Sequence, residues 1–341
     1  MRVIRDASLG SKRVFVRADL DVPLGDEGAF EAATRLKNLK PTIDLLVDKG
    51  ASRILIAGHI DRPQRPDPKL STAQLLEPLE KILLRSIIFK PHIQLKRDPA
   101  DVWDLAGPVV LMENLRFWPG EVANQMDFAE QLASLADVYV NEAFGNCHRR
   151  HASMVLLPQL IPSYAGLHLE QEARTLTKIL DNPQRPFVAI VGGAKIETKV
   201  PVIENLAEIA DFVLVGGELP LEIARTGQKF KPNVTIGKLQ SGDKDISPES
   251  VENFKDAIKS AKTIIWNGPL GLYEEGFEEG TLQLAQAILK SSAYSVVGGG
   301  ETTQFLANKS LLGAFSFVSA GGGAMLEFLA GKKLVAVSEL Q

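Results

Sequence analysis

The segment VAIVGGAKIETK, residues 188–199, runs from an apolar strand through two glycines into a stretch with helical character. If the helix begins directly after the glycines, Lys195 and Lys199 lie one turn apart on one face, where like charges repel by about 0.2–0.5 kcal/mol. Gly192 and Gly193 let backbone N–H groups approach a ligand closely, and the first turn of a helix adds positive partial charge. The segment therefore predicts a phosphate site, although a glycine turn beside two solvated lysines is a common origin of the same pattern.

Short β-branched runs alternate with longer amphipathic segments along the whole chain, which is typical of repeated βαβ units and a mainly parallel sheet. The expected strands are residues 14–18, 54–57, 109–112, 138–140, 187–191, 212–215, 263–266, 295–297 and 315–319. Glycines or polar side chains follow these strands directly. Because ligands bind at the carboxyl ends of the strands in open α/β sheets, this placement predicts the working face. The fold class is α/β.

Composition limits the kind of protein that this chain can be. With 341 residues, of which 45% are hydrophobic, it can fill two cores of ordinary size. The 38 basic and 42 acidic residues leave a net charge of −4, so we expect no general attraction to nucleic acid or to an anionic membrane. The start of the chain has no apolar signal core, and no apolar run approaches the roughly 18 residues of a membrane span. The one cysteine, Cys147, excludes an internal disulfide framework, so we expect a cytoplasmic protein.

The two halves of the chain differ in the residues that follow the expected strands. Arginine, histidine and aspartate stand there in the first half, and glycine, lysine, asparagine and glutamate in the second, which indicates two ligands. Between them, HLEQEARTLTKILDNPQRP (168–186) reads as a helix that ends at Asn182-Pro183. We therefore expect an N-terminal domain at 1–165, a C-terminal domain at 166–341 and a hinge helix at about 168–182. For the extreme C-terminus, packing back on the N-terminal domain is a further expectation.

Five basic residues of the first half lie at expected strand ends or in the following loops: Arg35, His59, Arg62, Arg116 and Arg149. The planar guanidinium matches phosphate and carboxylate, so several converging arginines would bind a small polyanion. Asp19 and Asp21 are two apart in extended chain, so both point the same way and can accept from a substrate hydroxyl. A lone arginine is more often a solvated surface charge, and His59 or His148 alone is more often structural. The run HRRH at 148–151 lacks a Cys or His partner at metal-ligand spacing and indicates an anion contact or a solvated turn.

Longer motifs surround these residues in both halves. In the first half they are RADLDVPL (17–24), GHIDRP (58–63), LMENLRFWPGE (111–121) and ADVYVNEAFGNCHRRHAS (136–153). In the second half they are RPFVAIVGGAKIETK (185–199), IIWNGPLGLYEEGFEEGT (264–281), VVGGGETT (296–303) and FVSAGGGAMLEFLAGKKL (317–334). Together they closely resemble the fingerprints of the phosphoglycerate kinases, over nearly the whole chain. The resemblance implies two Rossmann-like domains, each a mainly parallel sheet flanked by helices, joined by a hinge helix.

The resemblance also implies which residues bind ligands, with 3-phosphoglycerate on the N-terminal domain and the nucleotide on the C-terminal one. The substrate would contact Asp19, Asp21, Arg35, His59, Arg62, Arg116, His148 and Arg149. The nucleotide would contact Gly192, Gly193, Lys195, Lys199, Gly216, Gly217, Asn267, Glu274, Gly299, Gly300, Glu301 and Thr302. Residues implied in catalysis are Arg35, Lys195, Lys199 and Gly322, the last within a glycine triplet (321–323) that presents a helix N-terminus to the migrating group.

The implied reaction is reversible transfer of an acyl phosphate from 1,3-bisphosphoglycerate to MgADP, giving 3-phosphoglycerate and MgATP. Neither the attacking oxygen nor the leaving carboxylate needs a proton moved, which suits a site without a Ser-His or Cys-His pair. Catalysis would then depend on positioning and electrostatics. With the acid on one domain and the nucleotide on the other, the domains must close, which also expels water. The family further implies a monomer that acts on small molecules.

The chain departs from the family pattern where the metal and the base would bind. Glu301 stands in place of the aspartate expected to hold Mg²⁺, an ion that demands near-ideal geometry at about 2.0–2.1 Å. A glutamate in a first helical turn is also explained by the helix dipole. Glu218 and Pro220 replace residues of the nucleotide pocket, and the stretch 227–264 is shorter than usual. We therefore hypothesise that the nucleotide pocket fits adenine more loosely or admits another base. Asp21 replaces an asparagine, which adds negative charge near the substrate.

Two other classes of protein compete with this interpretation. A nicotinamide-dependent dehydrogenase also uses glycine-rich turns after strands, but no G-x-G-x-x-G follows an early strand, and no G-x-x-x-x-G-K-[ST] P-loop occurs. A binding protein that keeps the fold without turnover is the other alternative, because Glu301 and the shortened stretch both bear on the nucleotide side. An assay with 3-phosphoglycerate and MgATP separates these readings.

Overall fold

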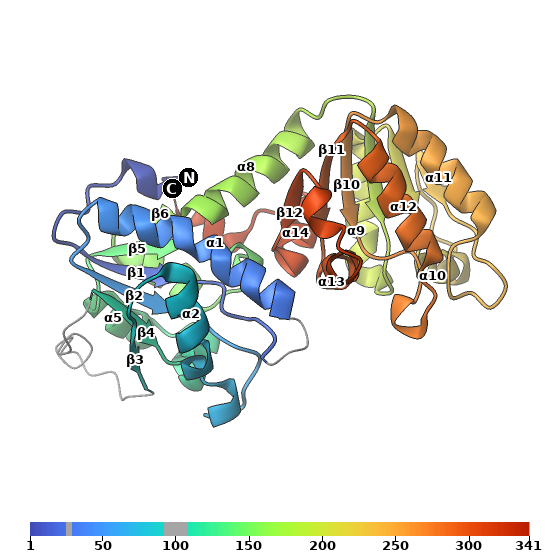
Figure 1. Ribbon diagram of the computed structural model, residues 1–341. Coiled ribbons are helices and arrows are strands. Elements are labelled where there is room, and N and C mark those ends of the chain that lie inside the picture. The colour runs from blue at the N-terminus through green and yellow to red at the C-terminus, as the bar shows by residue number, and fades with distance from the viewer. Residues whose placement is uncertain (25–28, 92–107, 341) are drawn as a thin grey trace. The chain divides into compact units, whose positions relative to one another are not determined.

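The computed structural model describes residues 1–24, 29–91 and 108–340 and divides the chain into two compact units (Figure 1). Unit 1 comprises residues 1–173 together with the segment that begins at Lys333, and unit 2 comprises Arg174–Lys332. The division falls within α8 (Leu167–Asp181), so this helix contributes to both units. The helix stops just before Asn182-Pro183, the breaker that the sequence indicated.

Unit 1 is built on a six-stranded sheet with the order β3-β4-β2-β1-β5-β6. Its strands are β1 (Arg13–Arg17), β2 (Arg53–Ala57), β3 (Ile88–Lys90), β4 (Val109–Met112), β5 (Val138–Asn141) and β6 (Ser163–Ala165). All neighbouring strands run parallel. In the register, Arg17 is level with Ala57 on one side and with Asn141 on the other. The carboxyl ends of the central strands therefore finish together at one edge.

Two groups of helices accompany this sheet. The helices are α1 (Ala29–Asp48), α2 (Leu76–Leu83), α4 (Pro119–Val122), α5 (Met126–Ser134), α6 (Ala152–Val155), α7 (Leu157–Leu160) and α15 (Val335–Ser338). Short 3₁₀ helices occur at η1 (Ile4–Asp6), η2 (Pro68–Leu70), η3 (Thr72–Leu75), η4 (Leu115–Phe117) and η5 (Phe144–Asn146). Helices α1 and α2 pack against each other in front of the strands in Figure 1, and α4 to α7 form a second group. Leu39 and Ile43 of α1 and Leu79 of α2 share one hydrophobic cluster with the strand side chains.

Unit 2 is a second parallel sheet with the order β12-β11-β10-β7-β8-β9. Its strands are β7 (Phe187–Val191), β8 (Phe212–Val215), β9 (Val234–Ile236), β10 (Thr263–Asn267), β11 (Tyr294–Gly298) and β12 (Phe317–Ser319). Its helices are α9 (Ile196–Ile209), α10 (Leu219–Thr226), α11 (Pro248–Ser260), α12 (Glu279–Lys290), α13 (Gly300–Asn308) and α14 (Gly322–Leu329), with 3₁₀ turns at η6 (Tyr273–Glu275) and η7 (Leu312–Ala314). Counted within the unit, this is the 3-2-1-4-5-6 order of doubly wound dinucleotide-type sheets. The strand order reverses between β7 and β10, which is where such folds bind ligands.

The predicted fold class is confirmed, since each unit is a parallel sheet flanked by helices. Every expected strand is present, and three further strands were not predicted: β3, β6 and β9. All three lie at a sheet edge and contain three residues each, several of them partly exposed. An edge strand needs no continuous apolar run, so the sequence signal was too short to register.

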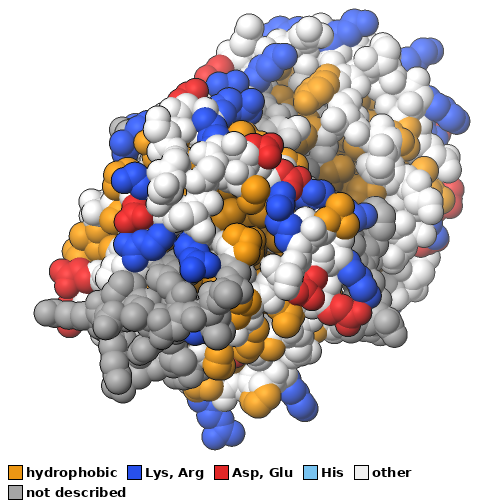
Figure 2. Space-filling model, turned by 60° about the vertical axis from the view of Figure 1, so that its left-hand side comes forward, with side chains coloured by type: hydrophobic (Ala, Val, Ile, Leu, Met, Phe, Trp, Pro, Cys, Tyr) orange, Lys and Arg blue, Asp and Glu red, His pale blue; other side chains and the backbone are white. Residues whose placement is uncertain are grey.

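The surface carries no broad face of one charge in the view that Figure 2 gives, where basic, acidic and apolar side chains are interspersed. This agrees with the nearly balanced composition. Within residues 1–24, 29–91 and 108–340, no helix combines the length and the apolar character that spanning a bilayer requires.

Candidate active site

The residues predicted to bind the substrate all lie at the carboxyl edge of the unit 1 sheet. They follow four strands that are adjacent in the sheet, β4, β2, β1 and β5. We call the following set the unit 1 site: Arg17, Asp19, Asp21, Arg35, His59, Arg62, Arg116, His148 and Arg149. Arg35 comes from α1, and Arg17 was not among the predicted residues. The topology therefore brings together side chains that are up to 132 positions apart in the sequence, from 17 to 149.

Arg17 is the last residue of β1 and is completely buried. Its Nη2 lies 2.7 Å from Nδ1 of His59, its Nε donates to Ser153 Oγ at 3.0 Å, and its Nη1 donates to the backbone oxygen of Ala18 at 2.6 Å. Ser153 in turn donates through Oγ to Oε1 of Glu121 at 2.6 Å. A buried charge needs partners of this kind, and here they hold the guanidinium behind the site. The sequence signal was present, because Arg17 directly follows the apolar run 14–16.

His59 and Asp21 face each other across the site, with His59 Nε2 and Asp21 Oδ2 3.5 Å apart. Burial lowers the pKa of His59 to about 3; Asp21 opposes this shift, and the charges of Arg17 and Arg116 add to it. Burial acts to raise the pKa of Asp21, but the contact with His59 and the hydrogen bond from the Asp61 N–H, 2.8 Å long, hold it well below its usual range. At neutral pH the pair therefore consists of a neutral imidazole and a carboxylate.

The arginines of this edge repel one another. Burial lowers the pKa of Arg116 to about 10, and the nearby charge of Arg149 contributes. The pKa of Arg149 is also lowered, first by burial and then by Arg62. Arg116 donates through Nη1 to the backbone oxygen of Asp61, which orients it. Burial and mutual repulsion both disfavour the charged forms of these arginines, and an anion bound between them would offset the repulsion. The arrangement therefore indicates an anion-binding site.

Arg35 and Asp19 complete the unit 1 site. Arg35 donates through Nη1 to the backbone oxygen of Asp21 at 2.9 Å, and it lines a hollow together with Asp21, Ile60 and Lys69. Burial raises the pKa of Asp19, while Arg35 opposes the shift. Asp19 accepts a hydrogen bond from Asn146 Nδ2 at 3.2 Å, which ties the loop after β1 to the loop after β5. His148 and Arg149 are half-buried on that second loop.

In unit 2 the glycine turn after β7 packs closely against the turn after β10. Gly192 N donates to Asn267 O and Gly193 N to Pro269 O, both at 2.9 Å. A Cβ at Gly192 would overlap the backbone oxygen of Pro269, and Gly193 has φ +91°, which only glycine adopts without strain. The two glycines are therefore required by the turn itself. This turn lies at the point where the strand order reverses.

Only one of the two lysines of the opening segment lies in the helix, whereas the helical spacing placed both there. Helix α9 begins at Ile196, so Lys195 is the N-cap residue with extended backbone and lies outside the helix. Its side chain is exposed, whereas Lys199 is only 6% exposed. Lys199 Nζ donates to Asn267 Oδ1 at 2.6 Å. Burial lowers the pKa of Lys199 to about 8, and the charge of Glu301 opposes the shift. The expectation that the helix starts directly after the glycines was wrong by about two residues, because the turn at Gly193 extends through Lys195.

A cavity opens beside these turns, which we call the unit 2 pocket. It is lined by Gly193, Ala194, Gly217, Glu218, Asp243, Lys244, Pro269, Gly271, Leu272, Glu274 and Glu301. Four of the predicted nucleotide-binding residues thus line it directly: Gly193, Gly217, Glu274 and Glu301. Asp243 and Lys244 were not predicted, because they belong to the shortened stretch, for which no motif exists. Glu218, which was noted as a departure, is part of the wall.

Other predicted residues support the pocket from behind. Asn267 is buried and holds Lys199, as described. Thr302 is completely buried, and its Oγ1 accepts a hydrogen bond from Gly268 N at 2.9 Å. Gly216 follows β8 and packs on Leu270, while Gly299 approaches the side-chain amide of Asn267. Gly300 and Gly322 are the first residues of α13 and α14. These residues lie at the same carboxyl edge, after β8, β10, β11 and β12.

The donor set of the unit 2 pocket fits a magnesium ion that a phosphate ligand brings along. No group of three or more His, Cys, Asp or Glu side chains suited to a metal occurs in the described part of the chain. Mg²⁺ commonly takes only one or two protein carboxylates and completes its shell with water and phosphate oxygens. Glu301, exposed in the first turn of α13, is a carboxylate of this kind. Its place in the pocket wall is consistent with the predicted metal role.

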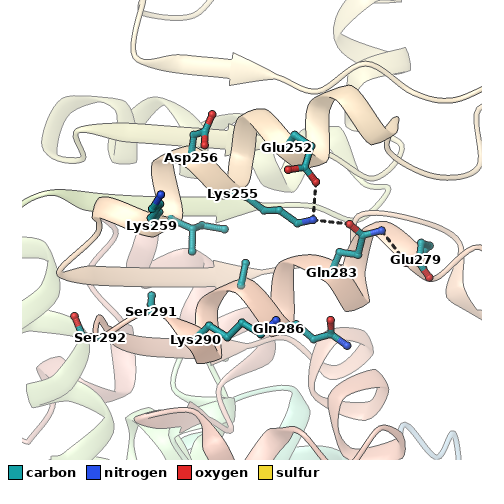
Figure 3. Close-up of a pocket in the computed structure, with 12 residues that line it drawn as sticks. Glu252, Lys255, Asp256, Lys259, Glu279, Gln283, Gln286, Lys290, Ser291 and Ser292 are labelled. Atoms are coloured by element: carbon teal, nitrogen blue, oxygen red, sulfur yellow. Dashed lines mark hydrogen bonds and ion pairs between the residues drawn. The ribbon is translucent and has the colours of Figure 1, made fainter.

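A second hollow lies elsewhere in unit 2, between α11 and α12 (Figure 3). Its wall is mixed in charge, and Lys255 bridges Glu252 at 2.7 Å and Gln283 at 2.6 Å. None of the predicted site residues contributes to it. The hollow is a polar groove between two packed helices and is separate from the carboxyl edge of the sheet.

Fold and sites together define a two-domain α/β protein with an arginine cluster at the carboxyl edge of one sheet and a pocket with glycine turns in its wall at the carboxyl edge of the other. A family model described as "Phosphoglycerate kinase" matches residues 4–231 and 221–332. The chain belongs to the phosphoglycerate kinase family.

Individual relatives agree over nearly their whole length. The phosphoglycerate kinase of Desulforudis audaxviator is 35% identical, and the match covers 93% of each chain. That of Leptospira biflexa serovar Patoc is 36% identical over 88% of each chain. Among solved structures, phosphoglycerate kinase from Coxiella burnetii superimposes with a TM-score of 0.82 at 31% identity, covering 99% of this chain and 98% of that one. The enzyme from Pyrococcus horikoshii OT3 gives 0.85 at 27% identity, covering 100% and 98%.

The buried histidines predict that acid unfolds unit 1 first. In the folded chain the pKa of His59 and of His151 is lowered to about 3 and that of His168 to about 4, chiefly by burial. Between the ordinary value of about 6.5 and these values the unfolded state binds more protons, so stability falls as the pH drops through this window. Glu142, whose pKa burial raises to about 7, and Asp19, whose pKa burial also raises, act in the opposite sense, but they are two groups against three. All five histidines of the sequence precede residue 174.

Hydrogen exchange followed by mass spectrometry at pH 7 and pH 5, corrected for intrinsic exchange, checks this expectation. Peptides of the unit 1 sheet should lose protection at pH 5, while peptides of the unit 2 sheet, which has no histidine, keep theirs. Equal loss in both units, or earlier loss in unit 2, would contradict the assignment of the acid sensitivity to these three imidazoles.

Proposed function

We propose that this chain catalyses reversible transfer of a phosphoryl group between 1,3-bisphosphoglycerate and MgADP, giving 3-phosphoglycerate and MgATP. Two features found together on one chain of this family carry the proposal. One is the cluster of mutually repelling arginines in unit 1, and the other is the unit 2 pocket, whose wall includes Gly193 with the buried Lys199 beside it. Neither alone distinguishes this reaction from other phosphate chemistry. This is the step of glycolysis, run in either direction, that the family catalyses.

The three-carbon acid is assigned to the unit 1 site. Arg62, Arg116 and Arg149 would bind its phosphate, since their mutual repulsion is relieved by an anion. Arg35 and His59 would bind the carboxyl end, and the aspartates after β1 the hydroxyl region. His148 would add a contact from the loop after β5. The neutral state of His59 supports a role as hydrogen-bond donor instead of a charge partner.

The nucleotide is assigned to the unit 2 pocket. Backbone N–H groups at the start of α9, α13 and α14 and the amines of Lys195 and Lys199 would bind the phosphates. Glu274, in the pocket wall, would accept from the ribose hydroxyls. Gly322 opens α14 toward the transferred group. In this scheme no side chain has to remove a proton, and the rate enhancement comes from positioning and from positive charge around the equatorial oxygens.

Activity itself is the first test of this proposal. Purified chain with 3-phosphoglycerate and MgATP should form ADP, measured in a coupled assay. Lys195→Ala should lower kcat by roughly 100-fold or more, because a preorganised charge on the transferring group is lost. Lys229→Ala, which removes an exposed lysine of the same unit, should leave the rate unchanged.

Two results would count against the enzyme. No turnover with intact binding of both ligands would favour the alternative of a binding protein that keeps the fold, and turnover of a nicotinamide cofactor would favour a dehydrogenase. Equal rates for Lys195→Ala and Lys229→Ala would remove Lys195 from the catalytic set.

Assigning one ligand to each unit requires that the units close during turnover, with bending at the α8 hinge. We propose that the domain boundary acts near residues 165–174, where α8 leaves unit 1. Small-angle X-ray scattering should show a smaller radius of gyration with 3-phosphoglycerate and MgADP together than with either alone. Forward scattering from the same samples should correspond to one chain, as expected for a cytoplasmic monomer that acts on small molecules. An unchanged radius with both ligands bound would contradict closure.

Mg²⁺, when bound with the nucleotide, would neutralise charge on the β- and γ-phosphate oxygens, and Glu301 is the residue that we assign to hold it. Glu301→Gln keeps the shape of the side chain and removes its charge. Calorimetry should show weaker MgADP binding, by at least about 10-fold, the lower end of what losing even an outer partner of a metal site costs. Binding of ADP without metal should stay the same or tighten. Equal losses with and without Mg²⁺ would assign Glu301 to the nucleotide instead of the metal.

The wall of the unit 2 pocket predicts weak discrimination between bases. Glu218, Asp243 and Lys244 form a polar part of the wall. Asp243 and Lys244 belong to the shortened stretch, which leaves fewer residues to enclose adenine. We expect kcat/KM for GDP and IDP to lie within about 10-fold of that for ADP, since base selection of about 1–3 kcal/mol requires a close-fitting pocket. A preference for ADP of 100-fold or more would end the hypothesis.

A further inference from the structure

The contact between Arg17 and His59 determines where the imidazole carries its proton. Nη2 of Arg17 lies 2.7 Å from Nδ1 of His59. A guanidinium has donors only, so Nδ1 must be the acceptor. In a neutral imidazole the single ring proton then resides on Nε2. The geometry thus selects one of two tautomers.

Arg17 has no freedom to leave this contact. Its other donors reach Ser153 Oγ at 3.0 Å and the backbone oxygen of Ala18 at 2.6 Å. Ser153 is held in turn by both carboxylate oxygens of Glu121, through its hydroxyl at 2.6 Å and its N–H at 2.9 Å. Arg17, Ser153 and Glu121 are all completely buried, so a carboxylate compensates the buried guanidinium through one hydroxyl. The series of hydrogen bonds from Glu121 through Ser153 to Arg17 thus fixes the side from which Arg17 donates to His59.

The Nε2 side of His59 faces the ligand region. Nε2 is buried and has no hydrogen-bond partner among the described residues. The distance of 3.5 Å to Asp21 Oδ2 is too long for a good hydrogen bond. A buried donor without a partner is costly unless a ligand supplies the acceptor. Nε2–H is therefore available to an oxygen bound beside Asp21.

We propose that Arg17 is a positioning residue that holds His59 as the neutral Nε2–H tautomer, so that this N–H donates to an oxygen of the three-carbon acid substrate. The inference rests on the proposed function, because it takes that acid as the ligand of the unit 1 site. Arg17 itself lies behind the imidazole and acts only through it.

The groups around His59 support the neutral form. From β1 and the loop after it come Arg17 and Asp21, from η4 comes Arg116, and the ring of His151, before α6, lies edge-on with centroids 6.1 Å apart. Two of these are cations, and burial disfavours an imidazolium further, so the pKa of His59 falls to about 3 against the single opposing charge of Asp21. His151 is neutral as well, with its pKa lowered to about 3 by burial first and then by Arg17. The donor is therefore present throughout the neutral range.

Long-range ¹H–¹⁵N spectra of the histidine-labelled chain test the proposal directly. We expect the wild-type His59 signals, assigned by loss in His59→Gln, to show a protonated Nε2 and no titration between pH 8 and pH 5. Adding 3-phosphoglycerate should shift Nε2 of His59. A protonated Nδ1 in the wild type, or no shift of Nε2 at saturating 3-phosphoglycerate, would overturn the inference. Both measurements are made on the wild-type chain and need no turnover, and the His59→Gln spectrum serves only for assignment.

Variants separate positioning from mere packing. Arg17→Lys keeps the charge but cannot reach Ser153, Ala18 and His59 together, so His59 should become a mixture of tautomers and begin to titrate above pH 5. Its KM for 3-phosphoglycerate should rise by roughly 10-fold, the cost of one hydrogen bond to a charged group, with a smaller change in kcat. An unchanged tautomer in a folded Arg17→Lys chain would refute the role of Arg17.

Substitutions of His59 itself give a matched pair. In His59→Gln the amide nitrogen can occupy the Nε2 position, whereas in His59→Asn it can only occupy the Nδ1 position. The Gln variant should bind 3-phosphoglycerate within a few-fold of the wild type, and the Asn variant roughly 10-fold more weakly. The reverse order would contradict donation from Nε2. Failure of the coupled assay for every variant and the wild type would refute the proposed function but leave the spectra able to decide the tautomer.

Discussion

Level strand ends are the constraint on which both sites depend. In a parallel sheet each strand ends beside its neighbour's end, and the register here is level: Arg17 lies opposite Ala57 and Asn141, and Asn267 lies opposite Val191 and Gly298. Every loop that follows these strands therefore begins within one strand spacing of the next, about 4.8 Å. A shift of one residue in register would move each strand's side chains to the opposite face and separate the residues that follow. The arginine cluster and the glycine turns are consequences of this alignment more than of any local helix or loop preference.

Much of this arrangement could be predicted from the sequence because it is carried by order along the chain. A strand followed within two residues by Asp19, by His59 or by Gly192 places that residue at the working edge whatever the rest of the fold does. How deeply each side chain is buried could not be predicted in this way. Nothing in the pattern separates Lys195 from Lys199, yet one is exposed and the other is buried against Asn267. The depth of a side chain is set by packing against elements far away in the sequence, and no spacing rule contains that information.

Buried polar groups show most clearly what could not be predicted from the sequence. Arg17 was passed over because it belongs to a strand, although a charged residue that ends an apolar run has to be buried with a partner or exposed. Thr302, which was predicted to bind the nucleotide, is completely buried, and its hydroxyl accepts a hydrogen bond from Gly268 N. In both cases the side chain works one layer behind the surface where a ligand would lie. Residues of this layer have no motif of their own, because many different partners can supply the same hydrogen bond.

Glu142 is a buried side chain of this kind, and it connects α1, which carries Arg35 of the unit 1 site, to the start of α8. Its carboxylate, at the end of β5, accepts from the hydroxyl of Thr42 on α1 and from the backbone N–H groups of His168 and Leu169 at 3.1 and 3.0 Å. The last two belong to the first turn of α8, where a negative charge is favoured by the helix dipole. Burial raises the pKa of Glu142 to about 7, and the same hydrogen bonds oppose the shift. Helix α1 also carries Arg35, so a displacement of that arginine on binding a substrate would act on a carboxylate that caps α8. Since the helix continues into unit 2, such a link from the ligand to α8 would pass through two buried side chains, Thr42 and Glu142.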